Sequence, residues 1–585
     1  NSGVLRGIGT LMLLIPLLFW AYKYFIKKWA TYFQNTLLSA LENRYQRFLE
    51  GALRGGRPYL FLFGTFGLLF SSFVLMGVFP PQVEFFPENQ PKQIMAYIEY
   101  PEGTAIEKTN AITKQIEQEM FRVIQQSKYI MDGANVMLES GVAQVGEGAG
   151  NPETDSGVTN EMPHKAKITL TMREFKYRAG FSSETLREEL QQALDGKFPG
   201  VAVSVEKDAA GPPVGYPINI EVTGKNYDQL VTTAANIKDF LNDENIDGIE
   251  KLKIDVNKNK PGLRLEIDRR KAGMLGVSAA SVGQQLRTSI FGAKAGIYKN
   301  DGEDYEINVR FNAENRYDKN ALLNQSITFR DQSSGKIKEV PITTLVRSSN
   351  TASYNAIKHR TLNRVVTVYS PVLAGYNANA VVENAKMALT NFTTPEGVSF
   401  KFTGEIEEQE KNMSFLSKAL LSALGLILLL LVFQFNSISK PIIILLSIFL
   451  SFTGVFLGLM LFQMPFVILM TMMGIISLAG IVVNNGVVLL DYTQLLIDRK
   501  RIANQLEEGT LLAQDAVVEA IVQGGTARLR PVILTAITTI LGLIPLAIGL
   551  NIDFFSLFSE WDPNIYIGGD NVIFWGPLAW TVIFG

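Results

Sequence analysis

Hydrophobic and polar positions are distributed unevenly along this chain, with nearly charge-free apolar runs towards both ends and a long polar stretch between them. A helix needs about 20 apolar residues to cross a bilayer, where it must satisfy its own backbone hydrogen bonds. Six runs are long enough and a seventh is incomplete: residues 8–26, 59–79, 415–435, 441–462, 466–490, 531–550 and 572–585. The pattern predicts an α-helical membrane protein with a large extramembrane region.

The two ends of the chain also carry information. The run at residues 8–26 is too long for a signal peptide, has no small-residue cleavage pattern and is followed by lysines, so we interpret it as a membrane helix. The chain begins at Asn1 without a methionine and stops inside an apolar run. We therefore expect it to be a segment of a longer polypeptide.

Basic residues in the short loops predict the orientation, because such loops stay in the cytoplasm. They cluster around residues 27–57, 440, 499–501 and 528–530. Alternation then places residues 80–413 on the opposite side, which in a bacterium is the periplasm. We expect a multi-pass protein of the bacterial inner membrane.

Between residues 29 and 49 the apolar side chains share one helical face: Trp29, Phe33, Leu37, Leu41, Tyr45 and Phe48. This spacing predicts an amphipathic helix lying along the membrane surface. An ordinary cytoplasmic helix packed on protein remains the alternative.

The long polar stretch has the alternating patterns of a mixed α/β domain. A first round has strands at 95–100, 166–172 and 201–205 with helices at 104–124 and 184–194. A second round has strands at 218–222, 263–267, 365–369 and 398–402 with helices at 227–241 and 378–389. We expect two split βαβ (ferredoxin-like) modules, the second carrying an insertion at 268–355.

Composition excludes several classes of function. The 54 basic and 56 acidic residues give a net charge of −2, too little for a nucleic-acid-binding face. With no cysteine and two histidines, thiolate and multi-histidine metal centres are excluded. No GK[ST] motif supports a nucleotide site, so we expect no cofactor, and transport energy has to come from an ion gradient or another subunit.

Polar residues inside an apolar span are costly and therefore mark candidate sites. Asn484 and Asn485 are adjacent in GIVVNNGVVLLD, and Arg530 precedes a span that contains Thr535. Interhelical hydrogen bonding of the amides and snorkelling of the arginine are the structural alternatives. From spacing alone, both kinds of role stay open.

Four segments together resemble a known family: GIVVNNGVVLLDYTQLL, TARLRPVILTAITTILGLIPLAIG, IDRRKAGMLGVSAASVGQQL and FTGEIEEQE. They are similar to the C-terminal half of resistance-nodulation-division (RND) exporters of the hydrophobic and amphiphilic efflux branch. The resemblance implies proton-driven export of hydrophobic or amphiphilic small molecules by a homotrimer, with a periplasmic adaptor protein and an outer-membrane channel as partners. It implies no enzymatic activity.

Mapped onto this family, the chain divides into eight parts. These are family helix 6 (1–26), a cytoplasmic amphipathic helix (27–57), helix 7 (58–79), porter subdomain 1 (80–178), porter subdomain 2 (179–267 and 356–412), a docking insertion (268–355) and helices 8 to 12 (413–585).

The resemblance also assigns candidate sites. Asn484 and Asn485 would face an aspartate pair of the other half, with Arg530 and Thr535 in the same proton relay. Asn484 stands where many drug pumps have a lysine, which is a departure. The segment 139–157 would match the loop between two drug pockets, with Glu139, Ser140, Gly146, Gly148 and Gly150 on the substrate pathway, but it lacks the family's phenylalanines.

Other functions remain to be weighed against export of organic compounds. A Sec-accessory-like protein-translocation helper would have a smaller extramembrane region and no insertion. A membrane-anchored periplasmic binding or sensing module would need no acidic pair in the other half. Heavy-metal export is the weakest alternative, because few ligand residues are present.

Overall fold

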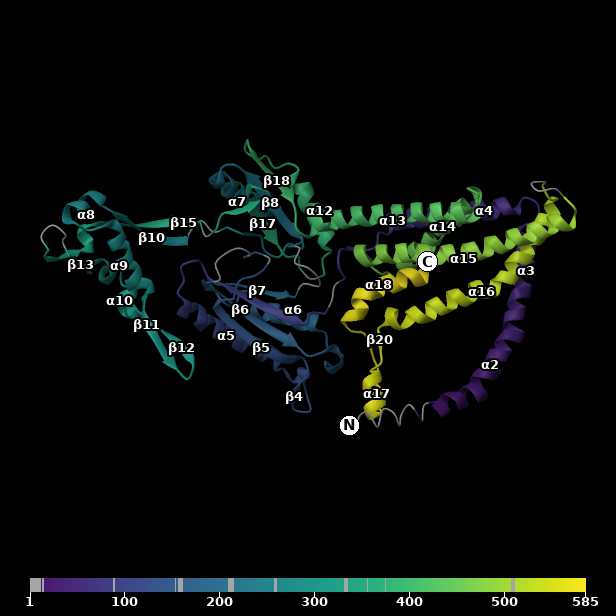
Figure 1. Cartoon of the computed structure of the whole chain (residues 1–585), viewed down its shortest axis with the longest axis horizontal. Coiled ribbons are helices and arrows are strands. Elements are labelled where there is room, and N and C mark those ends of the chain that lie inside the picture. The colour runs from purple at the N-terminus through teal and green to yellow at the C-terminus, as the bar shows by residue number, and fades with distance from the viewer. Residues whose placement is uncertain are drawn as a thin grey trace. The chain divides into compact units, whose positions relative to one another are not determined.

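The computed structural model describes residues 12, 15–87, 90–152, 154–155, 161–208, 215–256, 260–330, 335–354, 356–373, 375–506 and 511–585. It divides into two compact units (Figure 1). One comprises residues 1–255 and 358–585, and the other residues 256–357. We describe each unit by itself.

The first module of the larger unit is a four-stranded antiparallel sheet with the order β5-β6-β2-β7. Its strands are β2 (Gln93–Glu99), β5 (Leu138–Glu147), β6 (Glu161–Met172) and β7 (Ala202–Lys207). Helices α5 (Ile106–Ile124) and α6 (Ser183–Leu194) bury their apolar faces against alternate strand residues such as Ile94, Ala96 and Ile98. The strand residues between these core residues point to the other face of the sheet.

This sheet corrects one predicted boundary. We expected the first subdomain to end at residue 178, but α6 and β7 continue the same sheet and core to Lys207. Hydrophobic periodicity identifies a strand but not its partner, and β7 pairs with β2 across a long sequence separation. Short elements lie between the main strands: η3 (Ser127–Tyr129), β3 (Ile130–Met131), β4 (Ala134–Asn135) and η4 (Phe175–Tyr177).

The second module repeats the plan with the antiparallel order β16-β17-β8-β18, and β9 also pairs with β17. Its elements are β8 (Ile218–Gly224), α7 (Tyr227–Asp243), β9 (Lys253–Ile254), β16 (Lys358–Arg360), β17 (Asn363–Ser370), α12 (Ala378–Leu389) and β18 (Val398–Phe402). The chain leaves this module after β9 and returns at β16. The smaller unit is therefore an insertion in the second module.

The insertion begins earlier than expected. The predicted strand at 263–267 belongs to β10 (Lys260–Ile267), which pairs with β15 (Val346–Ser353) and not with the second module. The insertion thus spans residues 256–357 instead of 268–355. Its other elements are α8 (Arg269–Leu275), α9 (Ala279–Phe291), β11 (Ala293–Asn300), β12 (Glu303–Val309), α10 (Ala313–Tyr317), α11 (Lys319–Leu323), β13 (Ser326–Arg330), β14 (Ile337–Pro341) and η5 (Ile342–Thr344).

Five described helices are long and apolar enough to cross a membrane: α4 (Arg57–Val78), α13 (Glu405–Phe435), α14 (Ser439–Leu461), α15 (Ile468–Ala503) and α16 (Gln514–Ile548). Several are longer than the predicted spans, because a helix can continue beyond its apolar section. α18 (Asp570–Phe584) is shorter and packs against α14, α15 and α16. Most of the predicted span at 8–26 lies outside the described residues.

The predicted amphipathic segment at residues 29–49 is helical throughout, in α2 (Lys27–Tyr32), η2 (Phe33–Leu38) and α3 (Ser39–Ala52), and η1 (Tyr22–Ile26) precedes it. α3 packs against α16. A Cβ atom on Gly525 would lie 2.8 Å from Leu49 and 3.4 Å from Tyr45, so this part of the segment rests on protein.

Four short strands and one helix complete the described part of the larger unit. β1 (Val83–Glu84) pairs in parallel with β19 (Phe466–Val467) just before α15. Between α16 and α18 lies a segment that we name the α17 hairpin, residues 549–569. It contains β20 (Leu550–Asn551), α17 (Phe554–Glu560) and β21 (Tyr566–Ile567).

Candidate functional site

The polar centre of the helix bundle joins α15 and α16. The Thr535 hydroxyl oxygen lies 2.9 Å from Asn485 Oδ1 and 2.8 Å from the carbonyl oxygen of Val532. Both side chains are half-buried among apolar neighbours. Of the four predicted relay residues, the structure thus brings Asn485 and Thr535 together.

Asn484 points elsewhere, because adjacent residues of a helix lie about 100° apart. On the next residue, Gly486, a Cβ atom would lie 3.3 Å from Ile444 of α14, so this face of α15 meets α14. Asn485 meets α16, and Asn484 is exposed. Its carboxamide therefore lies on the surface of the helices described here.

Arg530 does not join this pair. Its Nε lies 3.7 Å from Glu42 Oε1 of α3, and its side chain is 53% exposed. The neighbouring Arg528 stacks its guanidinium 4.3 Å from the Tyr492 ring centroid. These contacts tie the middle of α16 (Gln514–Ile548) to α3 and α15.

The glycine-rich segment is less irregular than its sequence indicates. Glu139, Ser140 and Gly146 belong to strand β5, so the expectation of a loop beginning at 139 is wrong for this part. Gly148 and Gly150 follow the strand. The backbone has positive φ angles at Gly146 (+80°) and Gly148 (+70°). Residues 153, 156 and 157 lie outside the described residues.

The segment after β5 leads to a polar cavity that sequence reasoning missed. Its wall comes from the first module, the second module and the loop at 149–155, and its polar side chains are Tyr97, Glu99, Asn151, Thr154, Asp155, Lys165, Ser204, Glu206, Tyr216, Lys253 and Tyr369. None of the five predicted pathway residues lines it. The enclosed space is about 20 Å³, enough for one water molecule.

Strand parity explains why polar residues gather there. Ile98, Ala166 and Val205 point into the apolar core, so their neighbours Glu99, Lys165 and Glu206 point to the opposite face. In the sequence, the alternation of charged residues with core residues was the signal that could have indicated a polar face on each strand. Only the pairing of the strands shows that the charged residues of different strands meet.

The cavity holds two hydrogen-bonded groups. Lys165 Nζ lies 2.9 Å from Asp155 Oδ1 and 3.3 Å from Glu99 Oε1. Burial acts to lower the pKa of Lys165, but these two carboxylates outweigh it, so the pKa is raised and the ammonium stays charged.

In the second group, Asn151 Nδ2 donates to Glu206 Oε2 (3.1 Å) and to the Tyr216 hydroxyl (2.8 Å). That hydroxyl in turn donates to Glu206 at 2.9 Å. Burial and the Glu206 charge raise the Tyr216 pKa, and its ring stacks on Tyr369 at 5.1 Å. The cavity is therefore a polar connection between the two modules rather than an apolar pocket.

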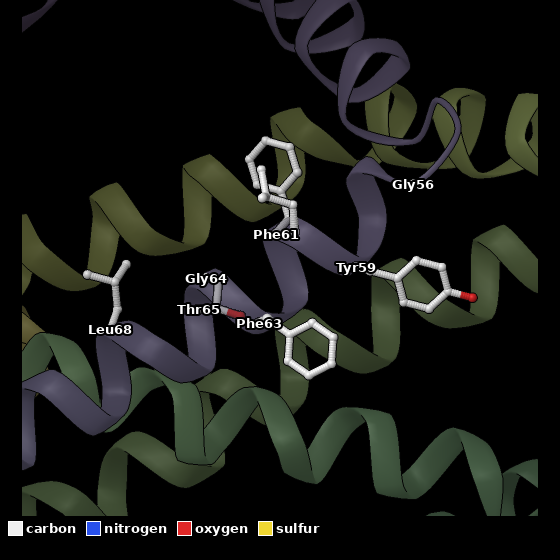
Figure 2. A pocket seen from close by; sticks show the side chains of 8 residues that line it. Gly56, Tyr59, Phe61, Phe63, Gly64, Thr65 and Leu68 are labelled. Atoms are coloured by element: carbon white, nitrogen blue, oxygen red, sulfur yellow. The ribbon is translucent and has the colours of Figure 1, made fainter.

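A second hollow, on α4, is apolar and open. Gly56, Tyr59, Leu60, Phe61, Phe63, Gly64, Thr65 and Leu68 line it, and Figure 2 shows their side chains along one stretch of the helix. Phe61 also packs edge-on against Phe48 of α3, with ring centroids 5.6 Å apart.

Within the described part of the chain, no group of three or more His, Asp or Glu side chains is arranged to hold a metal ion. The carboxylates of the cavity are instead occupied by Lys165, Asn151 and Tyr216.

Comparison with known proteins identifies the class. The sequence model of the AcrB/AcrD/AcrF family matches residues 24–551, and the chain belongs to this family of RND transporters. Its members are secondary active transporters and not enzymes. The fold, with its apolar helices and mixed α/β domain, is the RND transporter fold.

The names of the particular relatives describe different roles. The chain is 23% identical over 553 residues to the cobalt-zinc-cadmium resistance protein CzcA of Cupriavidus metallidurans, covering 93% of this chain and 48% of CzcA. It is 27% identical over 331 residues to the swarming motility protein SwrC of Bacillus subtilis, covering 56% of this chain and 29% of SwrC. The multidrug resistance protein MdtC of Erwinia tasmaniensis is 23% identical over 301 residues, covering 51% of this chain and 27% of MdtC.

A crystal structure of a heavy metal efflux pump superposes with a TM-score of 0.67 at 20% identity, covering 94% of this chain and 50% of the pump. At that identity the likeness shows the fold alone. The chain spans at most about half the length of these relatives.

Proposed function

We propose that this chain is the C-terminal half of a proton-driven RND exporter in a bacterial inner membrane, with the β modules in the periplasm. The observation that carries the proposal is the Asn485–Thr535 contact between two membrane helices of an RND fold. Two neutral polar side chains that meet inside an apolar bundle can respond to charge changes on a facing group without titrating themselves.

The proton-binding groups would come from the rest of the protein. Asn484 is exposed beside the Asn485–Thr535 pair, so its carboxamide is available to acids on further helices. Because Asn484 carries no charge, protonation of such acids would alter hydrogen bonds and not a salt bridge. Arg530 would act from the middle of α16, where its Nε lies 3.7 Å from Glu42 Oε1.

The substrate proposal starts from the resemblance, which points to hydrophobic or amphiphilic small molecules. That proposal keeps the predicted pathway residues, which are Glu139, Ser140, Gly146, Gly148 and Gly150. It also includes the polar cavity, to which the chain leads after these residues. The second candidate is export of metal cations, which the metal-resistance relatives favour. The cavity argues against this second candidate, since Lys165 neutralises two of its carboxylates, Glu99 and Asp155.

Family membership supports a proposal for the assembly. RND pumps form trimers that work with an adaptor protein and an outer-membrane channel. We propose the same partners here, with the insertion at residues 256–357 as the part that docks.

The test uses the complete protein in a strain that lacks other RND pumps. Asn484→Ala, Asn485→Ala and Arg530→Ala should each abolish efflux of a hydrophobic dye while the variants still assemble as trimers. Cobalt and zinc tolerance, measured in the same strains, separates the two substrate classes. Normal efflux of dye and metal by all three variants would refute the relay.

A further inference from the structure

The α17 hairpin is a small scaffold with many internal hydrogen bonds. Asn551 Nδ2 donates to the carbonyl oxygens of Gly549 and Gly568, both at 2.8 Å, and Gly568 N donates to Gly549 O at 2.9 Å. Asp553 caps α17 by accepting from two backbone N–H groups at 3.0 Å. The hairpin therefore has a defined shape that fixes where its side chains point.

This scaffold presents apolar side chains outward. Phe554 and Trp561 are each 60% exposed, Ile565 is 59% exposed and Ile567 is 66% exposed. A soluble surface seldom gathers so many large apolar side chains on one short segment, and such a patch usually marks a contact with protein or membrane.

The position of the hairpin in the chain indicates whether its apolar side chains face water or the membrane. It starts one residue after α16, which is long enough to cross a bilayer, and leads directly into α18, which packs among the membrane helices. Trp580 of α18 donates its indole N–H to the Ala547 carbonyl oxygen at 3.0 Å, which holds the two helices together beside the hairpin. Figure 1 shows α17 pointing away from α16 and α18 rather than along them.

The hairpin is also in contact with the first β module. The Phe175 ring lies 6.2 Å from the Tyr566 ring, and a Cβ atom on Gly568 would be 3.0 Å from Phe175. This contact places the hairpin at the end of the bundle that meets the β modules. If α16 crosses the membrane, that end lies at the surface of the bilayer.

The charges of the hairpin indicate how it would meet a lipid surface. Residues 549–569 include no lysine or arginine and three acids, Asp553, Glu560 and Asp562. Asp553 caps α17 and Asp562 accepts from the Asn564 N–H, so two of the acids serve the backbone. Electrostatic attraction to anionic headgroups is excluded as the source of binding, and apolar and aromatic insertion remains.

We propose that the α17 hairpin lies in the headgroup and upper acyl region of the leaflet next to the β modules, with Phe554, Trp561 and Ile567 in contact with lipid. The partner of this surface is the bilayer itself, including zwitterionic lipid. The inference depends on α16 crossing the membrane and not on what the protein transports.

Spin labels can test this proposal cleanly because the chain has no cysteine. The complete protein, free of other reactive cysteines, carries Phe554→Cys, Trp561→Cys or Ile567→Cys in phosphatidylcholine vesicles. Phe70→Cys, on the exposed face of α4, serves as the lipid control, and Tyr298→Cys, on β11 of the insertion, serves as the water control. Power-saturation spectra compare collisions with oxygen, which concentrates in lipid, and with a water-soluble nickel chelate.

We expect the ratio of oxygen to nickel collisions at positions 554 and 561 to lie above one, between the two controls, and to stay unchanged when anionic phosphatidylglycerol is added. Three results would overturn the proposal. The ratio could match that of the Tyr298 control, both collision rates could be low because protein covers the surface, or contact could depend on anionic lipid. The Ile567 label gives an independent reading if either aromatic replacement lowers expression.

Discussion

Replacing Thr535 by valine removes the hydroxyl that meets Asn485 and keeps the branched shape of the side chain. The native oxygen lies 2.9 Å from Asn485 Oδ1 across the helix interface. Thr535→Ser is the matched control, because it retains the hydroxyl and loses only a methyl group. The pair of variants separates the hydrogen bond from packing.

The structure sets a limit on the structural cost of this change. Interhelical side-chain hydrogen bonds in membranes contribute about 0.6 kcal/mol on average and at most about 1.7 kcal/mol. The Thr535 hydroxyl also lies 2.8 Å from the Val532 carbonyl oxygen within its own helix, which places this bond at the low end. A loss of about 0.6 kcal/mol changes an equilibrium about threefold, since 1.4 kcal/mol corresponds to tenfold.

The relay hypothesis requires a much larger effect on transport. We expect Thr535→Val to reduce proton-driven efflux by more than about tenfold, which a packing loss of this size does not reach. Thermal stability of the purified trimer should fall only slightly, and Thr535→Ser should transport normally. The assay is substrate movement by the complete protein in proteoliposomes under an imposed pH gradient.

A double-mutant cycle with Asn485→Leu completes the design. If the two residues act together, the double variant should transport no worse than Asn485→Leu alone. If Thr535→Val keeps efflux within threefold of the parent, and efflux follows stability, the contact is structural and our assignment is wrong.

Two further predictions concern the β modules. Lys165→Met leaves the largely buried Asp155 without its ammonium partner. It should destabilise the protein by about 2 to 3 kcal/mol, a value between the costs of breaking exposed and fully buried ion pairs. A melting temperature equal to that of Lys165→Arg would contradict this prediction. Burial and the nearby Glu206 charge raise the pKa of Glu250, so protonation of this carboxyl group favours the folded state. The stabilising contribution of the protonated group is complete below about pH 4.5 and is lost as the pH rises through the pKa of the folded state. Glu250→Gln, which cannot ionise, should therefore raise the melting temperature at pH 7 and lose this advantage near pH 4, whereas an equal gain at both values would show a cause other than ionisation.

Part of the candidate site was predictable because membrane burial is a strong sequence signal. The adjacent amides of α15 interrupt an apolar run, so Asn484 and Asn485 stand out without any structure. Their separate directions were not predictable. Only the packing of α14 and α16 around α15 shows that Asn485 meets Thr535 and that Asn484 is exposed. The packing of α3 on α16 shows that Arg530 pairs with Glu42.

The polar cavity shows the opposite case. Glu99, Lys165 and Glu206 lie on three different strands and look like ordinary surface charges in the sequence. They face a common space because the strand order β5-β6-β2-β7 places β2 between β6 and β7. A pattern of period two gives each strand two faces but does not say which strands are neighbours.

Within the described residues, the sequence by itself determined which helices are long and apolar enough to cross a membrane, and the alternation of helices and strands, because these depend on local periodicity and on the cost of placing polar groups in lipid. The tertiary structure decided where the modules begin and end, since residues 202–207 and 260–267 take partners far away in the chain. It also decided which polar side chains meet and which apolar ones stay exposed on the α17 hairpin. Such contacts depend on how distant segments pack, and that information is spread over the whole chain rather than held in any one stretch of it.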